Sequence, residues 1–220
     1  MKEIECIYLA WRTGKGQRRY KVGVIEKNDT TGFSFRYLVT EEEAKKIGFT
    51  SYTEFPDLSK KYSENVLGIF GQRLTKSERS DIQKYYDFWE IKPEHKEDKF
   101  YLLAHTQGLL ATDNFEFLAD YLPVKNLSFI SEICGLSQYK TSSDILKEGD
   151  VLRWEYEQNN EYDPKAVKIF KDDTLLGYVK IVHSCVFYKD EELKIKVKRA
   201  EKNGYLNRVF IKICAHNSNR

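Results

Sequence analysis

The sequence has little of what marks membrane-spanning, disordered or disulfide-bonded chains. No stretch approaches the roughly 18 consecutive apolar residues that a membrane-spanning helix needs, and the charged first six residues contain no apolar signal-peptide core. Only 4 residues are proline, and the 4 cysteines are far apart without a C-x-x-C pair, which favours free thiols. We therefore expect a globular cytoplasmic protein that has no contact with a membrane.

The motifs of the common catalytic sites are absent as well. The chain has no G-x-S-x-G nucleophile motif, no H-E-x-x-H zinc motif, no kinase catalytic-loop signature and no Walker lysine. Carboxylates are numerous, but their spacing does not pair them as a general acid and base. We therefore expect that the protein is not an enzyme.

The net charge is also small, because 36 Lys and Arg are balanced by 34 Asp and Glu. A net charge of +2 gives no global basic field that would indicate nucleic-acid binding. The split is uneven, since residues 1–122 carry −1 and residues 123–220 carry +3. A basic site would therefore have to be local, and the densest group of positive residues is Lys194, Lys196, Lys198 and Arg199.

Aromatic residues, in contrast, are plentiful, with 15 Tyr and 13 Phe, and they favour β-strands. In the first half, apolar and polar residues alternate as in a small antiparallel meander, with strands at residues 4–10, 19–25 and 33–39. The segment Thr40–Glu43 has the pattern of a capping box and predicts a helix that ends at Gly48. Helical spacing of apolar residues predicts further helices at residues 57–70, 77–89 and 98–108.

From about residue 123 the chain changes to short alternating stretches. Strands are predicted at residues 127–133, 151–158 and 166–170, and a final hairpin turns at Asn203-Gly204. So many short strands in so short a segment predict a small closed or partly open β-barrel. The predicted fold class is therefore α+β, with an N-terminal α+β domain at residues 1–122 and a barrel domain at residues 123–220.

Two pairs of residues could in principle hold a metal ion, namely His183 with Cys185 and Cys214 with His216. One intervening residue on a strand places both side chains of a pair on the same face. Structural zinc sites, however, typically separate paired cysteines by about two to four residues. We therefore expect no cofactor, and structural zinc is the less favoured alternative to buried cysteines with surface histidines.

The most unusual stretch of the second half is a polar turn with an aromatic residue at its centre. Asn160 and Asp163 favour a tight turn, and Pro164 restricts the backbone of the residue before it. Tyr162 stands within this turn, and Tyr178 follows a glycine after the next strand. Tyrosine is not needed to shape a turn, so its presence here calls for an explanation.

This turn allows two interpretations. In the first, the polar residues only shape the backbone, and the two tyrosines close the end of the barrel. In the second, the tyrosines stack on nucleic-acid bases, the polar residues hydrogen-bond a sugar or a base edge, and nearby lysines contact phosphates. Residue types alone leave both interpretations open, although turn and core roles are the commoner ones.

The same residues match a known pattern. Gly149-Asp150, the N-x-Y-D string at residues 160–163, Ala166-Val167 and Gly177-Tyr178 stand at the spacing of the HIRAN-domain signature. Roughly residues 123–220 therefore resemble a HIRAN domain. The resemblance implies an OB-like β-barrel that binds single-stranded DNA at its 3′-hydroxyl end. The chain departs from the family at Ser137-Gln138, where a basic-aromatic pair is usual, and at Glu161, where proline is common.

The layout of the whole chain resembles a group of bacterial HIRAN proteins. The shared elements are the strand Tyr8–Trp11, the segment Phe55–Leu58 and the stretch at residues 108–113. This resemblance implies that the two halves work as one unit, and it does not say what the first half does.

We therefore predict binding of nucleic acid without catalysis, most specifically of single-stranded DNA or DNA 3′ ends, in DNA processing or repair. Tyr162 and Tyr178 are predicted to stack, and Asn160 and Asp163 are predicted to hydrogen-bond the nucleic acid. The predicted phosphate contacts are Lys180, Lys194, Lys196 and Lys198. The alternative is a protein-interaction or regulatory module of a bacterial stress or defence system, with the N-terminal domain available to a protein partner.

Overall fold

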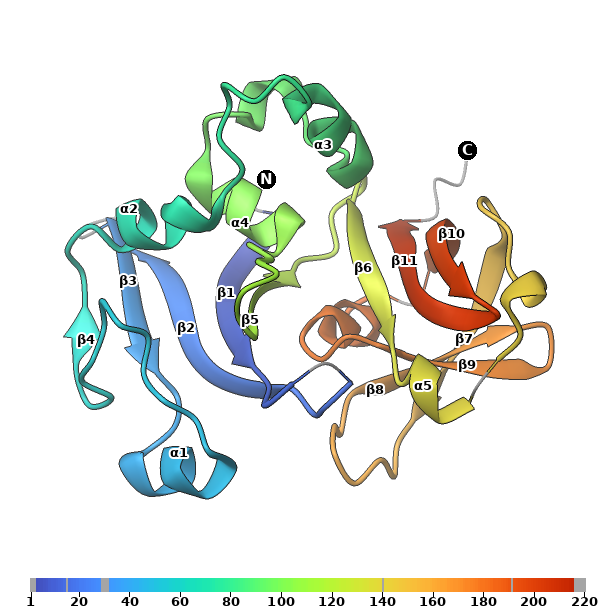
Figure 1. Cartoon of the computed structure of the whole chain (residues 1–220), viewed down its shortest axis with the longest axis horizontal. Coiled ribbons are helices and arrows are strands. Elements are labelled where there is room, and N and C mark those ends of the chain that lie inside the picture. The colour runs from blue at the N-terminus through green and yellow to red at the C-terminus, as the bar shows by residue number, and fades with distance from the viewer. Residues whose placement is uncertain (1–2, 15, 29–31, 140, 191, 216–220) are drawn as a thin grey trace. The chain divides into compact units, whose positions relative to one another are not determined.

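The computed structural model describes the chain except for residues 1–2, 15, 29–31, 140, 191 and 216–220. The chain forms two compact units (Figure 1), which comprise Ile4–Asp120 and Tyr121–Arg220 with Met1–Glu3. We call them the N-terminal unit and the barrel unit. Antiparallel sheets, a closed barrel and a few short helices confirm the predicted α+β class. The division into domains at residues 1–122 and 123–220 stays a prediction.

The N-terminal unit is built on a five-stranded sheet with the order β4-β3-β2-β1-β5. Three of its strands, β1 (Ile4–Trp11), β2 (Tyr20–Asn28) and β3 (Gly32–Tyr37), pair antiparallel and confirm the predicted meander. The edges are β4 (Lys61–Tyr62) and β5 (Phe115–Tyr121).

Short helices connect these strands. They are α1 (Glu41–Ile47), α2 (Val66–Phe70), η1 (Gly71–Arg73), α3 (Ile82–Trp89), η2 (Pro93–His95) and α4 (Lys99–Thr106). The predicted capping box is confirmed, because Thr40 and Glu43 each accept a hydrogen bond from the other's backbone N–H, and Gly48 ends α1 with a φ of 73°. Within the described chain, no helix is long and apolar enough to cross a membrane.

The prediction of one helix over residues 57–70 was wrong. The Asp57 carboxylate accepts hydrogen bonds from N and Oγ of Ser59 at 2.8 and 2.7 Å. This local turn competes with helical hydrogen bonding, and the following residues pair with β3 as β4. The helix begins only at Val66, after Asn65 has adopted a left-handed φ of 48°.

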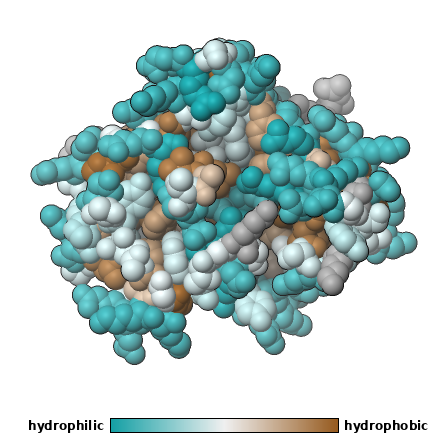
Figure 2. Space-filling view, in the orientation of Figure 1, coloured by the Kyte–Doolittle hydropathy of each residue, from teal (hydrophilic) through white to brown (hydrophobic). Residues whose placement is uncertain are grey.

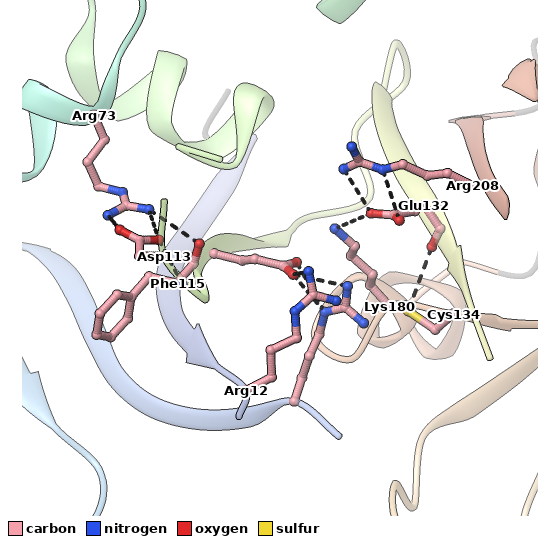
Figure 3. A network of polar contacts seen from close by, with 10 residues as sticks. Arg12, Arg73, Asp113, Phe115, Glu132, Cys134, Lys180 and Arg208 are labelled. Carbon is pink, nitrogen blue, oxygen red and sulfur yellow. Dashed lines mark hydrogen bonds and ion pairs between the residues drawn. The ribbon is translucent and has the colours of Figure 1, made fainter. Parts of the chain in front are cut away.

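Buried charges in this unit are neutralised by partners that are distant in sequence. The Arg73 side chain, 3% exposed, donates to both carboxylate oxygens of Asp113 at 2.5 and 2.8 Å (Figure 3). Glu116, also 3% exposed, pairs with Arg12 at 3.3 Å and with Arg19 at 3.0 Å. Removal of one partner from such a pair would leave an uncompensated buried charge, so these pairs hold β5 and the segment before it in place.

A buried histidine also lies in this unit. The ring of His105 stacks on Tyr101 at 4.0 Å, and Tyr101 stacks on His95 at 4.1 Å. Burial, with a smaller contribution from Lys92, lowers the pKa of His105 to about 3. The imidazole is therefore neutral in the folded protein over most of the acidic range.

We expect the folded state to lose stability as the pH falls from 6.5 towards 3. The unfolded imidazole takes up a proton near its ordinary pKa of about 6.5, whereas the folded one does so only near 3, so the unfolded state binds more protons in this window. Between pH 6.5 and pH 5 the effect amounts to up to about 2 kcal/mol, measured by urea unfolding. His105→Leu should flatten this dependence and His95→Gln should not. Identical pH dependence of wild type and His105→Leu would contradict the assignment.

The barrel unit is a closed barrel of six antiparallel strands in the order β10-β11-β6-β9-β8-β7, which confirms the predicted barrel. The strands are β6 (Ser128–Cys134), β7 (Val151–Glu157), β8 (Ala166–Lys171), β9 (Thr174–Val179), β10 (Leu193–Asn203) and β11 (Tyr205–Ala215). The helical segments between them are α5 (Leu136–Tyr139), η3 (Ser143–Ile145) and η4 (His183–Tyr188). Fully buried residues such as Val167, Ile169 and Ile211 form its core.

Gly177 allows two strands of the barrel to come into close contact. Its φ of 150° is a backbone conformation that L side chains rarely adopt, and a Cβ at this position would lie 2.1 Å from the carbonyl oxygen of Cys134 in β6. Only glycine avoids this clash. The glycine thereby also positions Tyr178, which is the ladder partner of Cys134.

Gly177→Ala should destabilise the barrel unit by more than about 3 kcal/mol, because it combines backbone strain with a clash against main chain. Gly149→Ala is the matched control, since Gly149 has a φ of 87° but no atom within 4 Å of the added Cβ. The control should cost about 1–2 kcal/mol from strain alone. Thermal and urea unfolding measure both, and equal losses in the two variants would show that the contact with Cys134 is not tight.

Candidate functional site

Exposed aromatic side chains direct attention to the barrel unit. The face of the molecule seen in Figure 2 is mainly hydrophilic, with small separate apolar patches. Within the described chain, only a few large hydrophobic side chains are exposed, and four of them are tyrosines. All four belong to the barrel unit, and they are Tyr139, Tyr162, Tyr188 and Tyr205.

Tyr162 lies in the loop between β7 and β8, residues 158–165, which we call the tyrosine loop. Asn160 organises this loop, because its Oδ1 accepts hydrogen bonds from the backbone N of Tyr162 and of Asp163, both at 2.9 Å. Its Nδ2 donates to Oε2 of Glu157 at 2.6 Å. The sequence motif is thus a side-chain-stabilised turn that is attached to the end of β7.

Asp163 anchors the other side of the tyrosine loop. Its Oδ1 accepts a hydrogen bond from the backbone N of Lys165 at 2.9 Å, and its Oδ2 accepts one from Oγ of Ser184 in η4 at 3.3 Å. The loop is therefore held to two different elements of the barrel. Tyr162, between the two anchors, is 64% exposed.

Tyr178 lies on β9, where its ladder partner on β8 is Lys168. It is half-buried, and burial raises its pKa, with further increases from the neighbouring side chains of Tyr139 and Glu157. Its hydroxyl therefore stays protonated and can donate a hydrogen bond.

Glu157 joins Tyr178 to the tyrosine loop. One carboxylate oxygen accepts from Asn160, and the other pairs with Nζ of Lys168 at 2.6 Å. The hydrogen bond from Asn160, followed by the contact with Lys168, lowers the pKa of Glu157, which therefore remains ionised. Sequence reasoning missed this residue. The available signal was an acidic residue at the end of β7, three positions before the Asn of the motif.

The structure brings four predicted site residues together and separates the lysines from them. Asn160, Tyr162 and Asp163 share one loop, and Glu157 connects them with Tyr178. The strand β10 lies three strands from β9 in either direction around the barrel. The exposed or half-buried lysines of β10, which are Lys194, Lys196 and Lys198, therefore lie away from Tyr178. β10 pairs directly with β7, but with the beginning of that strand, whereas the tyrosine loop follows its end.

Lys180 is fully buried. Its Nζ lies 3.1 Å from Oε2 of Glu132 on β6, and the same carboxylate accepts from Arg208 at 3.0 and 3.3 Å (Figure 3). A buried lysine needs such a partner to keep its charge. The exposed cation nearest to the motif in sequence is instead Lys165.

The four candidate metal ligands lie as follows. His183 is buried, and its Nδ1 lies 2.8 Å from Oγ of Ser131. Cys185 and Cys214 are half-buried free cysteines, and His216 lies outside the described residues. In the described part of the chain, no three His, Cys, Asp or Glu side chains are grouped as metal ligands.

Comparison with known proteins gives only a distant likeness. The sequence matches no protein-family model and no curated protein. The HIRAN domain of human HLTF aligns with 41% of this chain and 77% of its own, at 16% identity and a TM-score of 0.32. A protein from Lactobacillus plantarum aligns with 41% of this chain and 95% of its own, at 18% identity and a TM-score of 0.31. At these scores neither likeness carries an argument about function.

Asn160→Ala should loosen the tyrosine loop without unfolding the barrel. The substitution removes the acceptor of two backbone N–H groups, and each lost hydrogen bond costs roughly 0.5–1.5 kcal/mol. We expect faster amide hydrogen exchange at Tyr162 and Asp163, and a loss of only about 1–2 kcal/mol in overall stability. Asn159→Ala, at an exposed neighbour, is the control. Unchanged exchange in Asn160→Ala would show that the loop is held by other contacts.

Proposed function

We propose that the barrel unit binds nucleic acid and that the tyrosine loop receives the end of a single strand, most specifically the 3′ end of single-stranded DNA. A role in DNA processing or repair would follow from this activity. The observation that carries the proposal is an aromatic ring that is 64% exposed on a loop whose backbone is held by side-chain hydrogen bonds.

Stacking would supply most of the affinity. Aromatic side chains stack on bases with roughly 1–3 kcal/mol per base. Tyr162 offers one exposed ring, and Tyr178 with its neighbour Tyr139 offers a second aromatic surface. Because the tyrosine loop is already ordered, little conformational entropy is lost when a base stacks on it.

The polar residues divide into positioning and contacting groups. Oδ1 of Asn160 already accepts two hydrogen bonds, so we assign this side chain to holding the loop. Oδ2 of Asp163 accepts a single long hydrogen bond and keeps capacity for a sugar hydroxyl. We leave out of the phosphate contacts the buried Lys180 and Lys168, which is paired with Glu157, and assign the exposed Lys165 to this part of the site.

A second function, docking of a basic peptide, is favoured by the charge around the tyrosines. The segment from β7 to β9, residues 151–179, contains six Asp and Glu against four Lys and Arg. Carboxylates beside an exposed tyrosine suit a cationic partner, and this is the protein-interaction alternative in concrete form. It would fit a regulatory module better than a DNA-processing one.

Fluorescence anisotropy with labelled single-stranded DNA, bearing a free or a phosphate-blocked 3′ end, separates these functions. We expect the wild type to prefer the free end, and Tyr162→Ala to weaken binding roughly 10-fold, as loss of one stacked base implies. Tyr205→Ala removes a similarly exposed tyrosine, 59% against 64%, from the first position of β11. This control should bind as the wild type does.

Two results would refute the proposal. The first is absence of wild-type binding at low salt, and the second is an equal loss in Tyr162→Ala and Tyr205→Ala. Binding of a labelled oligolysine that Tyr162→Ala abolishes, without DNA binding, would support peptide docking instead.

A further inference from the structure

The final two strands of the barrel unit form a strongly basic hairpin. Residues 193–215, here the basic hairpin, contain seven Lys and Arg and one Glu. The remainder of residues 123–220 contains ten Lys and Arg and 13 Asp and Glu. The positive charge of this half of the chain is therefore concentrated on β10 and β11, while the remaining elements carry a net negative charge.

Two lysines of the basic hairpin lie opposite each other on its paired strands. Lys194 and Lys196 are exposed, and Lys196 is the direct ladder partner of Lys212 on β11. Like charges directly opposite each other destabilise a sheet. Within the described part of the chain, neither Lys194 nor Lys196 has an ion-pair partner.

The carboxylates near the basic hairpin form ion pairs with its arginines. The Glu201 carboxylate lies 3.5 Å from the Arg199 guanidinium. Glu132 on β6 pairs with Arg208 and with the buried Lys180. Arg199 is thus paired within the hairpin and Arg208 with the neighbouring strand β6, while the charge of Lys194 and Lys196 is left available to an external anion.

The exposed lysines of β10 stand in a row. Residues two apart on a strand are separated by roughly 6.6–6.8 Å and point to the same face, so Lys194 and Lys196 are close enough to contact one polyanion. A ladder shift between Val197 and Arg199 interrupts the regular pairing at Lys198, so the regular part of the row consists of Lys194 and Lys196. A duplex carries one negative charge per about 1.7 Å of its axis, whereas the side chains on one face of an extended acidic peptide repeat only about every 6.6–6.8 Å, so the duplex is the denser anionic partner for this row.

We infer that the basic hairpin binds the sugar-phosphate backbone of a nucleic-acid duplex, on a surface separate from the tyrosine loop. β10 pairs with Val151 and Leu152 at the beginning of β7, whereas the tyrosine loop follows Glu157 at the end of that strand, so the two surfaces lie at different ends of β7. The inference stands independently of the single-strand function proposed above.

The test uses the full chain and a blunt DNA duplex whose 3′ ends carry phosphate. The logarithm of the association constant is measured against the logarithm of the salt concentration, for wild type and for the double variant Lys194→Gln with Lys196→Gln. Each lost phosphate contact reduces the slope by about one, so the double variant should lose about two. Its thermal midpoint should stay equal or rise, because repulsion of Lys212 is removed.

Two controls make the result specific. Lys125→Gln with Lys147→Gln removes the same charge from exposed positions outside the basic hairpin and should keep the wild-type slope. Tyr162→Ala should also leave duplex binding unchanged. If both double variants lose the same amount of salt dependence, the inference is overturned, because duplex binding would then depend on the net charge of the protein and not on the basic hairpin. If the wild type does not bind the duplex but binds polyglutamate, the inference is overturned, and an acidic protein partner is favoured instead.

Discussion

Closure of the barrel is the constraint on which the arrangement of the barrel unit depends. It is made by a short contact, in which Ile195 and Lys196 of β10 pair with Leu152 and Val151 of β7. Two backbone hydrogen bonds of 2.8 Å between Val197 and residues 149–150 extend it. In a closed ring of six strands, β9 and β10 have two strands between them on either side. This geometry separates Tyr178 from the lysine row, whereas Tyr162 is separated from it along β7, because β10 pairs with the beginning of β7 and the tyrosine loop follows its end.

The features that were predictable from the sequence are those with local causes. The capping box at Thr40, the hairpin turn at Asn203-Gly204 and the alternating strands each depend on residues within a few positions of one another. The barrel as a class followed from the number of such strands. The prediction of a helix over residues 57–70 was wrong for a local reason too. The Asp57 carboxylate accepts hydrogen bonds from Ser59, and this turn prevails over the apolar spacing that suits a helix.

The candidate site was predictable only in part, because its geometry depends on pairs that are distant along the chain. The turn made by Asn160 and Asp163 was identified, since such side chains bond their own backbone. The burial of Lys180 depends on Glu132 on another strand, and alternation does not indicate which strands are neighbours. The separation of Tyr178 from Lys194 likewise depends on the order of the strands in the barrel. The alternation of apolar and polar residues indicates where strands lie but not their order.

Glu157 determines both the order of the tyrosine loop and the charge beside it. Its carboxylate orders the tyrosine loop through Asn160 and neutralises Lys168, so one ionised group both shapes the aromatic surface and lowers the positive charge beside it. The aromatic surface therefore has few available cations beside it.

The uneven charge of the barrel unit also has a kinetic consequence. With a net positive hairpin on one part of the wall and net negative segments elsewhere, the unit carries an electric dipole. In the field of a polyanion such a dipole rotates before contact, and steering of this kind raises association rates at low ionic strength. An encounter with a polyanion would thus begin with β10 and β11 foremost.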